Sequence, residues 1–372
     1  MIDRPGYIQQ IETQFKTHPV VALLGPRQCG KTTLARMFAQ TQSTTFFDLE
    51  NPVDTQKLTA PMQILSKLEG LIIIDEFQRE PQLLEILRVL VDKPQTDQKY
   101  LILGSASPSL IKSSSESLAG RVGFVDLAGF SIREISSTDI QKLWLYGGFP
   151  RAFLADSTAS SAAWRDAFIR TFLERDIPQL GINIPAYTLR RFWTMISHYH
   201  AQIWNGAELA RAMGTSEHTV RRYLEILSGA YMLRILPPWY ENLKKRQVKS
   251  PKIYLRDSGI LHSLLGVTSE MEMLGHPKSG ASWEGFALEQ FLLINGLRDV
   301  YFWRTHGGAE LDLLYFQSGK PIGVEFKFTD APGMTKSMHN ALTDLSLEKL
   351  YVVYPGNDEY QIHDKVTVTP LS

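Results

Sequence analysis

The residues from Gly25 to Thr33 have the types and the spacing of a phosphate-binding loop. They follow an apolar run, VVALL, and open an amphipathic stretch; in order they are Gly25, Pro26, Arg27, Gln28, Cys29, Gly30, Lys31, Thr32 and Thr33. A Walker A loop of this kind surrounds phosphates with backbone N–H groups at a helix N-terminus. We expect Lys31 to reach the β and γ oxygens and Thr32 to bind the metal. The loop therefore predicts ATP and Mg²⁺ as ligands.

Two acids end a later apolar run, in the segment LIIIDEFQ. Asp75 is expected to hold the metal through water, and Glu76 to activate the attacking water as a general base. The next run, YLILGSASPS, places Ser105 where a hydroxyl could sense the γ-phosphate. An ordinary hydroxyl in a turn after a strand is the alternative interpretation of Ser105.

Two arginines and the single cysteine complete this region. Arg121, in the segment LAGRV, is a candidate arginine finger acting across a subunit boundary, because a positive charge there would stabilise the transition state. Arg27, inside the loop, is a second candidate. Surface arginines are common, so the alternative is that neither arginine has a catalytic role. Cys29 is interpreted as a spacer of the loop, since no base that could activate it as a nucleophile can be named.

A second group of charged residues lies near the C-terminus. Asp312 belongs to the segment ELDLLYF, and Glu325 and Lys327 belong to GVEFKF, with the turn QSGK between them. Residues two apart on a strand share a face, so Asp312 across the turn can reach Glu325 and Lys327. These two carboxylates predict a Mg²⁺ or Mn²⁺ site in which Lys327 orients water or steadies charge on a phosphate. The arrangement resembles the D…(D/E)-X-K core of metal-dependent nucleases, and this resemblance implies Glu284, on the preceding helix, as an additional metal-binding acid. The alternative is a half-exposed hairpin with an ordinary polar face.

The surrounding elements fall into four patterns. Residues 20–126 alternate short apolar runs with amphipathic stretches, which indicates buried parallel strands in a wound α/β sheet. Residues 139–199 have a helical pattern typical of a lid. Residues 205–239 read as a helix, a tight glycine turn, a second helix and a strand, which resembles a winged helix-turn-helix. From residue 252 onward the pattern predicts a small α/β domain.

The second helix of the predicted helix-turn-helix would expose polar side chains able to meet phosphates or base edges, namely Glu217, His218, Thr219, Arg221 and Arg222. A basic stretch follows it, with Lys244, Lys245, Arg246, Lys249 and Lys252. Both features favour nucleic acid as a partner. Winged helices also act as scaffold or protein-contact modules, and a charge run is often a solvated loop, so those readings stay open.

Composition limits the class of protein. With 372 residues the chain exceeds one ordinary domain, and its 39 basic and 39 acidic residues give no net charge, which counts mildly against non-specific nucleic-acid binding. No apolar run is long enough to span a membrane, and the first residues lack the pattern of a secretory signal. A single cysteine fits a reducing compartment. We expect a cytoplasmic protein.

The order of the motifs is specific. The Walker A loop, IIIDE, LILGSA, LAGRV, WLYGGFPRAFL and FLERDI together resemble prokaryotic AAA+ ATPases that carry a C-terminal domain of unknown function, DUF4143, related to the PD-(D/E)XK nuclease fold. The resemblance covers nearly the whole chain. It implies a P-loop AAA+ core at 1–135, a helical lid at 136–200, a winged helix-turn-helix at 201–250 and a restriction-endonuclease-like α/β domain at 251–372. It also implies a homo-oligomer, such as a hexameric ring, that cleaves ATP between subunits.

These features suggest an ATP-hydrolysing protein that acts on nucleic acid, with branched or partly unwound DNA as the expected substrate and a metal-dependent nuclease domain. Two alternatives remain. The chain could be a nucleotide-controlled switch whose last domain only binds a protein partner or nucleic acid. It could also be a helicase or branch-migration motor that does not cut.

Overall fold

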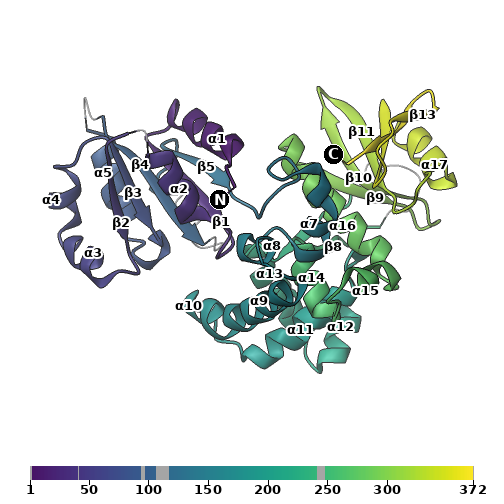
Figure 1. Cartoon of the computed structure of the whole chain (residues 1–372), viewed down its shortest axis with the longest axis horizontal. Helices are drawn as coiled ribbons and strands as arrows, with labels where there is room; N and C mark the ends of the chain where they lie inside the picture. The colour runs from purple at the N-terminus through teal and green to yellow at the C-terminus, as the bar shows by residue number, and fades with distance from the viewer. Residues whose placement is uncertain (1, 41, 94–96, 106–116, 241–247, 372) are drawn as a thin grey trace. The chain divides into compact units, whose positions relative to one another are not determined.

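The computed structural model describes residues 2–40, 42–93, 97–105, 117–240 and 248–371 (Figure 1). The chain divides into two compact units. Unit 1 contains residues 1–129 with 229–231, and unit 2 contains residues 130–228 and 232–372. Each unit has its own sheet and its own apolar core, so each is described by itself.

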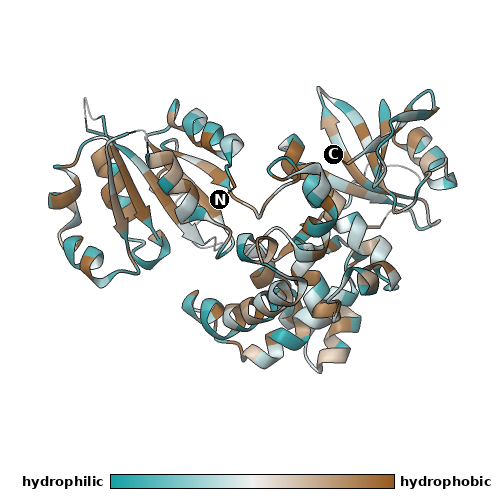
Figure 2. Cartoon of the chain, viewed as in Figure 1, coloured by the Kyte–Doolittle hydropathy of each residue, from teal (hydrophilic) through white to brown (hydrophobic). Residues whose placement is uncertain are grey.

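Unit 1 is built on a five-stranded parallel sheet in the order β2-β3-β4-β1-β5, as the alternating sequence pattern predicts. The strands are β1 Val20–Gly25, β2 Thr44–Asp48, β3 Leu71–Asp75, β4 Lys99–Ser105 and β5 Val122–Asp126. The helices are α1 Pro5–Phe15, α2 Lys31–Ala39, α3 Pro52–Lys57, α4 Pro61–Leu65 and α5 Leu83–Val91, with a 3₁₀ turn at Phe77–Arg79. The central strands are buried along their length and appear as brown bands in Figure 2, as expected for a sheet covered on both faces.

The loop between β1 and α2 needs unusual backbone geometry. Gln28 and Gly30 have φ values of 62° and 98°, and α2 begins directly after Gly30. A Cβ at Gly25 would lie 2.3 Å from the carbonyl oxygen of Leu127, so the chain can pass there only with glycine. These features turn the backbone sharply from the end of a buried strand into a helix N-terminus.

The first part of unit 2 is helical. Its helices up to residue 229 are α7 Ile140–Tyr146, α8 Pro150–Phe153, α9 Thr158–Thr171, α10 Ile177–Gln179, α11 Ala186–His198, α12 Gly206–Met213 and α13 Glu217–Gly229. A π-helical segment, Phe172–Asp176, joins α9 to α10. The turn between α12 and α13 contains Gly214 at φ 68°, which matches the tight glycine turn expected from the sequence. A three-stranded antiparallel sheet in the order β6-β8-β7 accompanies this helix pair, with β6 Gln202–Ile203, β7 Leu233–Leu236 and β8 Lys252–Leu255.

The second part of unit 2 contains a six-stranded mixed sheet in the order β13-β14-β12-β11-β10-β9. Its strands are β9 Val300–Arg304, β10 Glu310–Gln317, β11 Lys320–Phe326, β12 Lys349–Tyr354, β13 Tyr360–His363 and β14 Val366–Pro370. The helices of this part are α14 Ser258–Leu265, α15 Glu270–Gly275, α16 Ser279–Asn295 and α17 Lys336–Asp344. The predicted hairpin turn is confirmed, because Gln317 pairs with Lys320 across Ser318 and Gly319, both at positive φ.

A buried polar relay joins three helices of unit 2. The indole Nε1 of Trp144 donates to Ser282 Oγ at 3.0 Å, and that hydroxyl lies 2.8 Å from Nε2 of His262. Nδ1 of the same histidine is 3.0 Å from the carbonyl oxygen of Leu145. Because each group has a partner, α7, α14 and α16 can be packed tightly without leaving an unsatisfied polar atom in this relay.

Candidate functional site

The predicted phosphate-binding loop forms a compact turn around the Lys31 side chain. Its Nζ donates to the carbonyl oxygens of Gly25 at 3.1 Å and Pro26 at 2.8 Å, and the side chain is buried. The Cys29 side chain is also buried, as expected for a spacer. The ammonium group of Lys31 is therefore held inside the loop, next to the backbone N–H groups at the start of α2.

A residue that the sequence analysis missed supports this loop from the N-terminus. Arg4 is buried and donates to the carbonyl oxygens of Cys29 at 3.3 Å, Ala128 at 3.2 Å and Gly129 at 2.9 Å. It thereby ties the loop to the segment after β5. Nothing in its local sequence signals this contact, because its partners lie 25 to 125 residues away.

Thr32 and Asp75 meet where α2 begins and β3 ends. The Thr32 hydroxyl donates to Oδ2 of Asp75 at 2.6 Å, and Oδ1 accepts the backbone N–H of Glu76 at 2.9 Å. Burial raises the pKa of Asp75, although both hydrogen bonds oppose that effect. A hydroxyl and a carboxylate in contact at this position are the two side-chain ligands that P-loop proteins offer to Mg²⁺. The geometry fits that ion, and the assignment of these two residues stays a prediction.

A short network surrounds Glu76. This residue has a left-handed backbone conformation with φ 53°, which turns the chain sharply after β3. The amide nitrogen of Gln78 contacts the Glu76 carboxylate and also donates to Ser105 Oγ at 3.0 Å. Gln78 thus connects the predicted general base with the predicted sensor. Gln78 was not among the predicted site residues. Its position, two residues after Glu76, could have indicated that it lies near the acid pair.

The candidate arginine finger is engaged within its own chain. Nε and Nη2 of Arg121 contact the two carboxylate oxygens of Asp92 at 2.6 Å and 2.8 Å. A role across a subunit boundary would require this exposed bidentate pair to open. Arg27 is half-buried in the loop. The finger role stays a prediction for both arginines.

The C-terminal carboxylates come together in the fold. The register of β10 and β11 pairs Leu313 with Val324, so Asp312 and Glu325 are at neighbouring positions across the two strands. The ladder between β9 and β10 shifts register between Leu311 and Leu314, a bulge beside Asp312 of the kind that re-aims side chains. Both carboxylates are buried, in contrast to the half-exposed hairpin face that was the alternative.

A lysine occupies the centre of this cluster. Nζ of Lys252, the first residue of β8, lies 3.1 Å from a Glu284 oxygen and 3.3 Å from an Asp312 oxygen, and it also contacts Glu310. We define the carboxylate cluster as Glu284, Glu310, Asp312 and Glu325. Lys252 is 2% exposed, so its charge cannot be balanced by water.

The assignment of Glu284, Asp312 and Glu325 as ligands of a metal ion stays a prediction. Among the residues that the structure describes, no group of three or more His, Cys, Asp and Glu side chains is arranged to hold a metal ion. The Lys252 ammonium group contacts two of these carboxylates, Glu284 and Asp312. Lys252 was predicted to belong to a basic stretch that favours nucleic acid, but its side chain is buried; Lys244, Lys245 and Arg246 lie outside the described residues.

The remaining oxygens of the cluster have other partners. Asp312 Oδ2 accepts the backbone N–H of Phe326 at 3.1 Å, and the Tyr254 hydroxyl donates to Glu284 at 2.7 Å. Lys327 Nζ lies 2.6 Å from a Glu325 oxygen. Burial and the Asp312 charge raise the pKa of Glu325 to about 8 and that of Glu284 to about 7.

The outer side of the helix pair α12–α13 is polar. Glu217, His218, Arg221 and Arg222 are exposed, whereas Val220 on the same helix is fully buried, as the sequence predicts. Arg221 forms an exposed ion pair with Glu225 at 3.2 Å. Two guanidinium groups and an imidazole on one exposed helix could contact phosphates or base edges.

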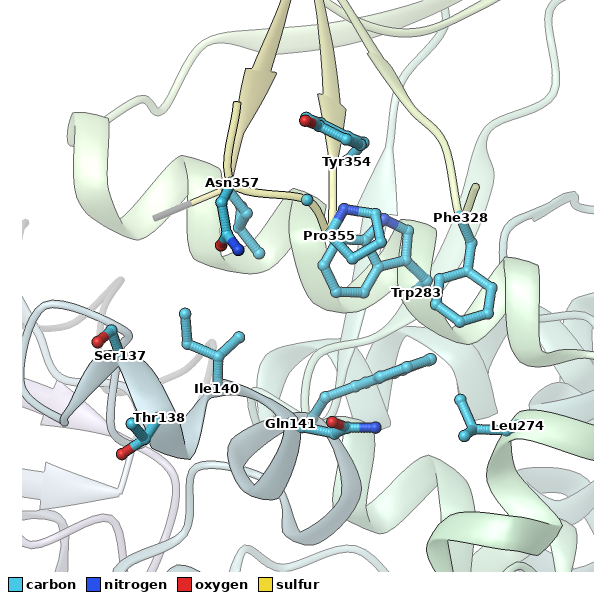
Figure 3. Close-up of a pocket in the computed structure, with 13 residues that line it drawn as sticks. Ser137, Thr138, Ile140, Gln141, Leu274, Trp283, Phe328, Tyr354, Pro355 and Asn357 are labelled. Atoms are coloured by element: carbon cyan, nitrogen blue, oxygen red, sulfur yellow. The ribbon is translucent and has the colours of Figure 1, made fainter. Parts of the chain in front are cut away.

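An aromatic pocket of about 270 Å³ lies elsewhere in unit 2 (Figure 3). Trp144, Trp283 and Phe328 form one wall, with ring centroids 5.1 to 5.9 Å apart. Gln141 and Asn357 are among the polar residues that line the pocket, and no charged residue is among its lining residues. Phe328 is 38% exposed, although its ring lies against Trp144 and Trp283.

No helix in the described part of the chain has both the length and the apolar character needed to cross a membrane.

Comparisons with known proteins place this geometry in a family. Three family models match successive segments: an AAA domain at residues 17–136, a domain of unknown function (DUF8612) at residues 137–271 and a domain of unknown function (DUF4143) at residues 279–372. Among solved structures, the Walker-type ATPase PABY2304 of Pyrococcus abyssi is 14% identical with a TM-score of 0.48, covering 71% of this chain and 96% of that one. The signal transduction ATPase PH0952 of Pyrococcus horikoshii is 13% identical with a TM-score of 0.30, covering 80% and 46%.

Two mycobacterial proteins are far more similar. The uncharacterized protein Rv2008c of Mycobacterium tuberculosis and the uncharacterized protein Mb2031c of Mycobacterium bovis are each 50% identical over 370 residues. The match covers 100% of this chain and 84% of each relative. The chain therefore belongs to the same family as these two proteins, a prokaryotic family with an AAA-type ATPase domain followed by a C-terminal DUF4143 domain.

Proposed function

We propose that this protein binds and hydrolyses MgATP in unit 1 and uses the nucleotide state to control how unit 2 engages nucleic acid. Branched or partly unwound DNA is the substrate class that we propose. The observation that carries the ATPase part is the 2.6 Å hydrogen bond between Thr32 and Asp75, next to the buried Lys31.

The residues of the loop would act together on the phosphates. Lys31 would exchange the carbonyl oxygens of Gly25 and Pro26 for phosphate oxygens, and the N–H groups at the start of α2 would bind the same chain of phosphates. Mg²⁺ held by Thr32 and Asp75 would supply charge neutralisation on the β and γ oxygens.

The predicted base lies at the end of the neighbouring strand. Glu76 would accept the proton of the attacking water once Gln78 releases its carboxylate, and Ser105, which bonds to the same amide, would report on the γ-phosphate. Assembly into a homo-oligomer, such as a hexameric ring, and the arginine finger at Arg121 stay predictions.

The nucleic-acid part rests on the helix pair α12–α13 and the sheet β6-β8-β7. Their order along the chain, after α11, matches that of a winged helix-turn-helix, and the exposed second helix carries His218, Arg221 and Arg222. Because Lys252 lies among the residues of the carboxylate cluster, we propose that unit 2 binds or remodels the nucleic-acid strand without metal-dependent cleavage.

The test measures phosphate release by the wild type, Lys31→Ala and Glu76→Gln with Mg²⁺, alone and with single-stranded, duplex and branched DNA or RNA. We expect loss of activity in both variants and stimulation of the wild type by a branched or partly unwound structure. Arg221→Ala should reduce that stimulation, whereas Arg170→Ala, which alters an equally exposed i,i+4 ion pair with Glu174 on α9, should not.

The outcomes separate the functions. Hydrolysis that ignores every nucleic acid offered would support the switch acting on a protein partner and would refute the nucleic-acid part. Strand displacement that requires Lys31 would support the motor reading. Full activity in Lys31→Ala would refute the ATPase assignment itself.

A further inference from the structure

Lys252 and the carboxylate cluster belong to different parts of the family architecture. Lys252 lies within the segment matched by DUF8612, residues 137–271, whereas Glu284, Glu310 and Asp312 lie within the segment matched by DUF4143, residues 279–372. The lysine reaches the carboxylates because β8 and the six-stranded sheet fold into one compact unit.

We propose that Lys252 is a built-in substitute for a divalent cation: the preceding segment inserts its ammonium group among the DUF4143 carboxylates and makes this domain independent of metal. The inference concerns the acidic cluster of unit 2, and it does not depend on ATP hydrolysis or on nucleic-acid binding.

The chemistry of the ammonium group fits this role. A lysine ammonium group has three N–H donors, and Lys252 Nζ contacts three carboxylates, those of Glu284, Glu310 and Asp312. Each donor can therefore be paired with an anionic acceptor. At 2% exposure the group has almost no access to water, so these carboxylates replace its hydration.

Most of the negative charge of the carboxylate cluster is offset by cations of the protein itself. Lys327 lies 2.6 Å from Glu325, and Arg304 lies 3.1 Å from Glu310, in addition to the contacts of Lys252. Burial alone would lower the pKa of Lys252, but the surrounding carboxylates raise it well above its ordinary value, so the lysine stays charged. Three cations thus face the four carboxylates.

A divalent ion and Lys252 cannot share this position. Both would need the same oxygens of Glu284 and Asp312, and two cations at contact distance repel strongly in a buried environment. The other Asp312 oxygen is already bonded to the Phe326 N–H. A metal could enter only if the lysine side chain left, and its position in the paired strand β8 opposes that movement.

The first experiment uses the unaltered protein. Binding of Mn²⁺ to the full chain without nucleotide is measured by the electron paramagnetic resonance signal of free Mn²⁺, in the wild type and in Glu325→Gln. We expect the same titration for both proteins, since any background binding elsewhere does not involve Glu325. A saturable site lost in Glu325→Gln, or Mg²⁺-dependent DNA cleavage lost in that variant, would overturn the proposal.

The second experiment removes the lysine. Lys252→Met retains the length of the side chain without its charge and should acquire Mn²⁺ binding about tenfold or more tighter than the wild type, because buried Asp312 and partly buried Glu284 and Glu310 lose their counter-ion. Adding Glu325→Gln should weaken the acquired site. Lys320→Met, which removes an exposed partner of Glu348, is the matched control and should behave like the wild type.

Stability gives an independent readout. All seven tryptophans lie between residues 144 and 303, so tryptophan fluorescence reports on unit 2 alone. The melting temperature of unit 2 in Lys252→Met should fall by roughly 10 °C, and Mn²⁺ should restore part of that loss. A folded Lys252→Met protein with neither Mn²⁺ binding nor Mn²⁺ stabilisation would overturn the proposal; if the variant does not fold, the comparison of wild type with Glu325→Gln decides.

Discussion

Replacing Thr32 by valine tests whether the hydrogen bond between Thr32 and Asp75 stabilises unit 1 and whether the Thr32 hydroxyl binds Mg²⁺. Valine has nearly the shape of threonine but cannot donate the 2.6 Å hydrogen bond to Asp75. Asp75 is 4% exposed, so water cannot fully replace the lost donor, although the Glu76 N–H remains bonded at 2.9 Å. A hydrogen bond to a charged group contributes about 1.5–3 kcal/mol, and we expect a loss of about 2 kcal/mol in the unfolding free energy of unit 1.

The measurement can be confined to unit 1. Far-UV circular dichroism follows both units, whereas tryptophan fluorescence follows unit 2, so a transition seen only by circular dichroism belongs to unit 1. For a unit of this size, about 2 kcal/mol corresponds to a decrease of roughly 6 °C in its melting temperature. The fluorescence transition should not move.

The same substitution should also remove a ligand of Mg²⁺. Since a bound metal contributes several kcal/mol to stabilising the transferring phosphoryl group, we expect phosphate release to fall about 100-fold in Thr32→Val. Thr32→Ser retains the hydroxyl and is the control, with stability and activity close to the wild type. If the serine and valine variants behave alike in both assays, the hydroxyl has neither role and the reasoning is refuted.

Three further predictions concern buried polar groups and the predicted base. Ser282→Ala should lower the unfolding free energy of unit 2 by about 2 kcal/mol, read by urea titration of tryptophan fluorescence, because Nε2 of His262 and the indole N–H of Trp144 lose their shared partner; no change would contradict the relay. Burial lowers the pKa of His200 to about 3 and that of His262 to about 4, below the ordinary 6.5. The unfolded chain therefore binds more protons than the folded one as the pH falls below about 6.5. We expect each histidine to lower the unfolding free energy of unit 2 by about 2 kcal/mol at pH 5. The raised pKa values of Glu284 and Glu325 act in the opposite direction over this range, so the histidine contribution is measured as the difference in unfolding free energy between the wild type and His262→Gln at pH 7 and at pH 5; a difference that does not change with pH would disprove this. Gln78→Ala should raise kcat for ATP hydrolysis with KM unchanged, because it frees the Glu76 carboxylate; a lower kcat would show that Gln78 holds the base in its working position.

Much of unit 1 could be predicted from the sequence because its signals are local. The Walker A residues are consecutive, and the strand before them and the helix after them are visible as an apolar run and an amphipathic stretch. Asp75 and Glu76 likewise end a continuous apolar run. Parallel strands end at the same edge of a sheet, so the meeting of Thr32 with Asp75 follows from these local patterns once the sheet forms.

The acidic cluster was predictable only in part. The two-residue period and the QSGK turn correctly placed Asp312 beside Glu325, because a hairpin is a local structure whose register is set by its turn. Lys252, in contrast, was assigned to the basic stretch that precedes it, since several of its neighbours along the chain are basic.

Local patterns in the sequence thus determined the nucleotide loop, the parallel sheet and the hairpin, where each residue acts beside its chain neighbours. Tertiary structure alone decided that Lys252, 60 residues before Asp312, enters a buried position among carboxylates from a later segment. A charge in a protein interior must be balanced by groups that the fold brings into contact with it. Those groups can come from any distance along the chain, so the sequence near Lys252 does not identify them.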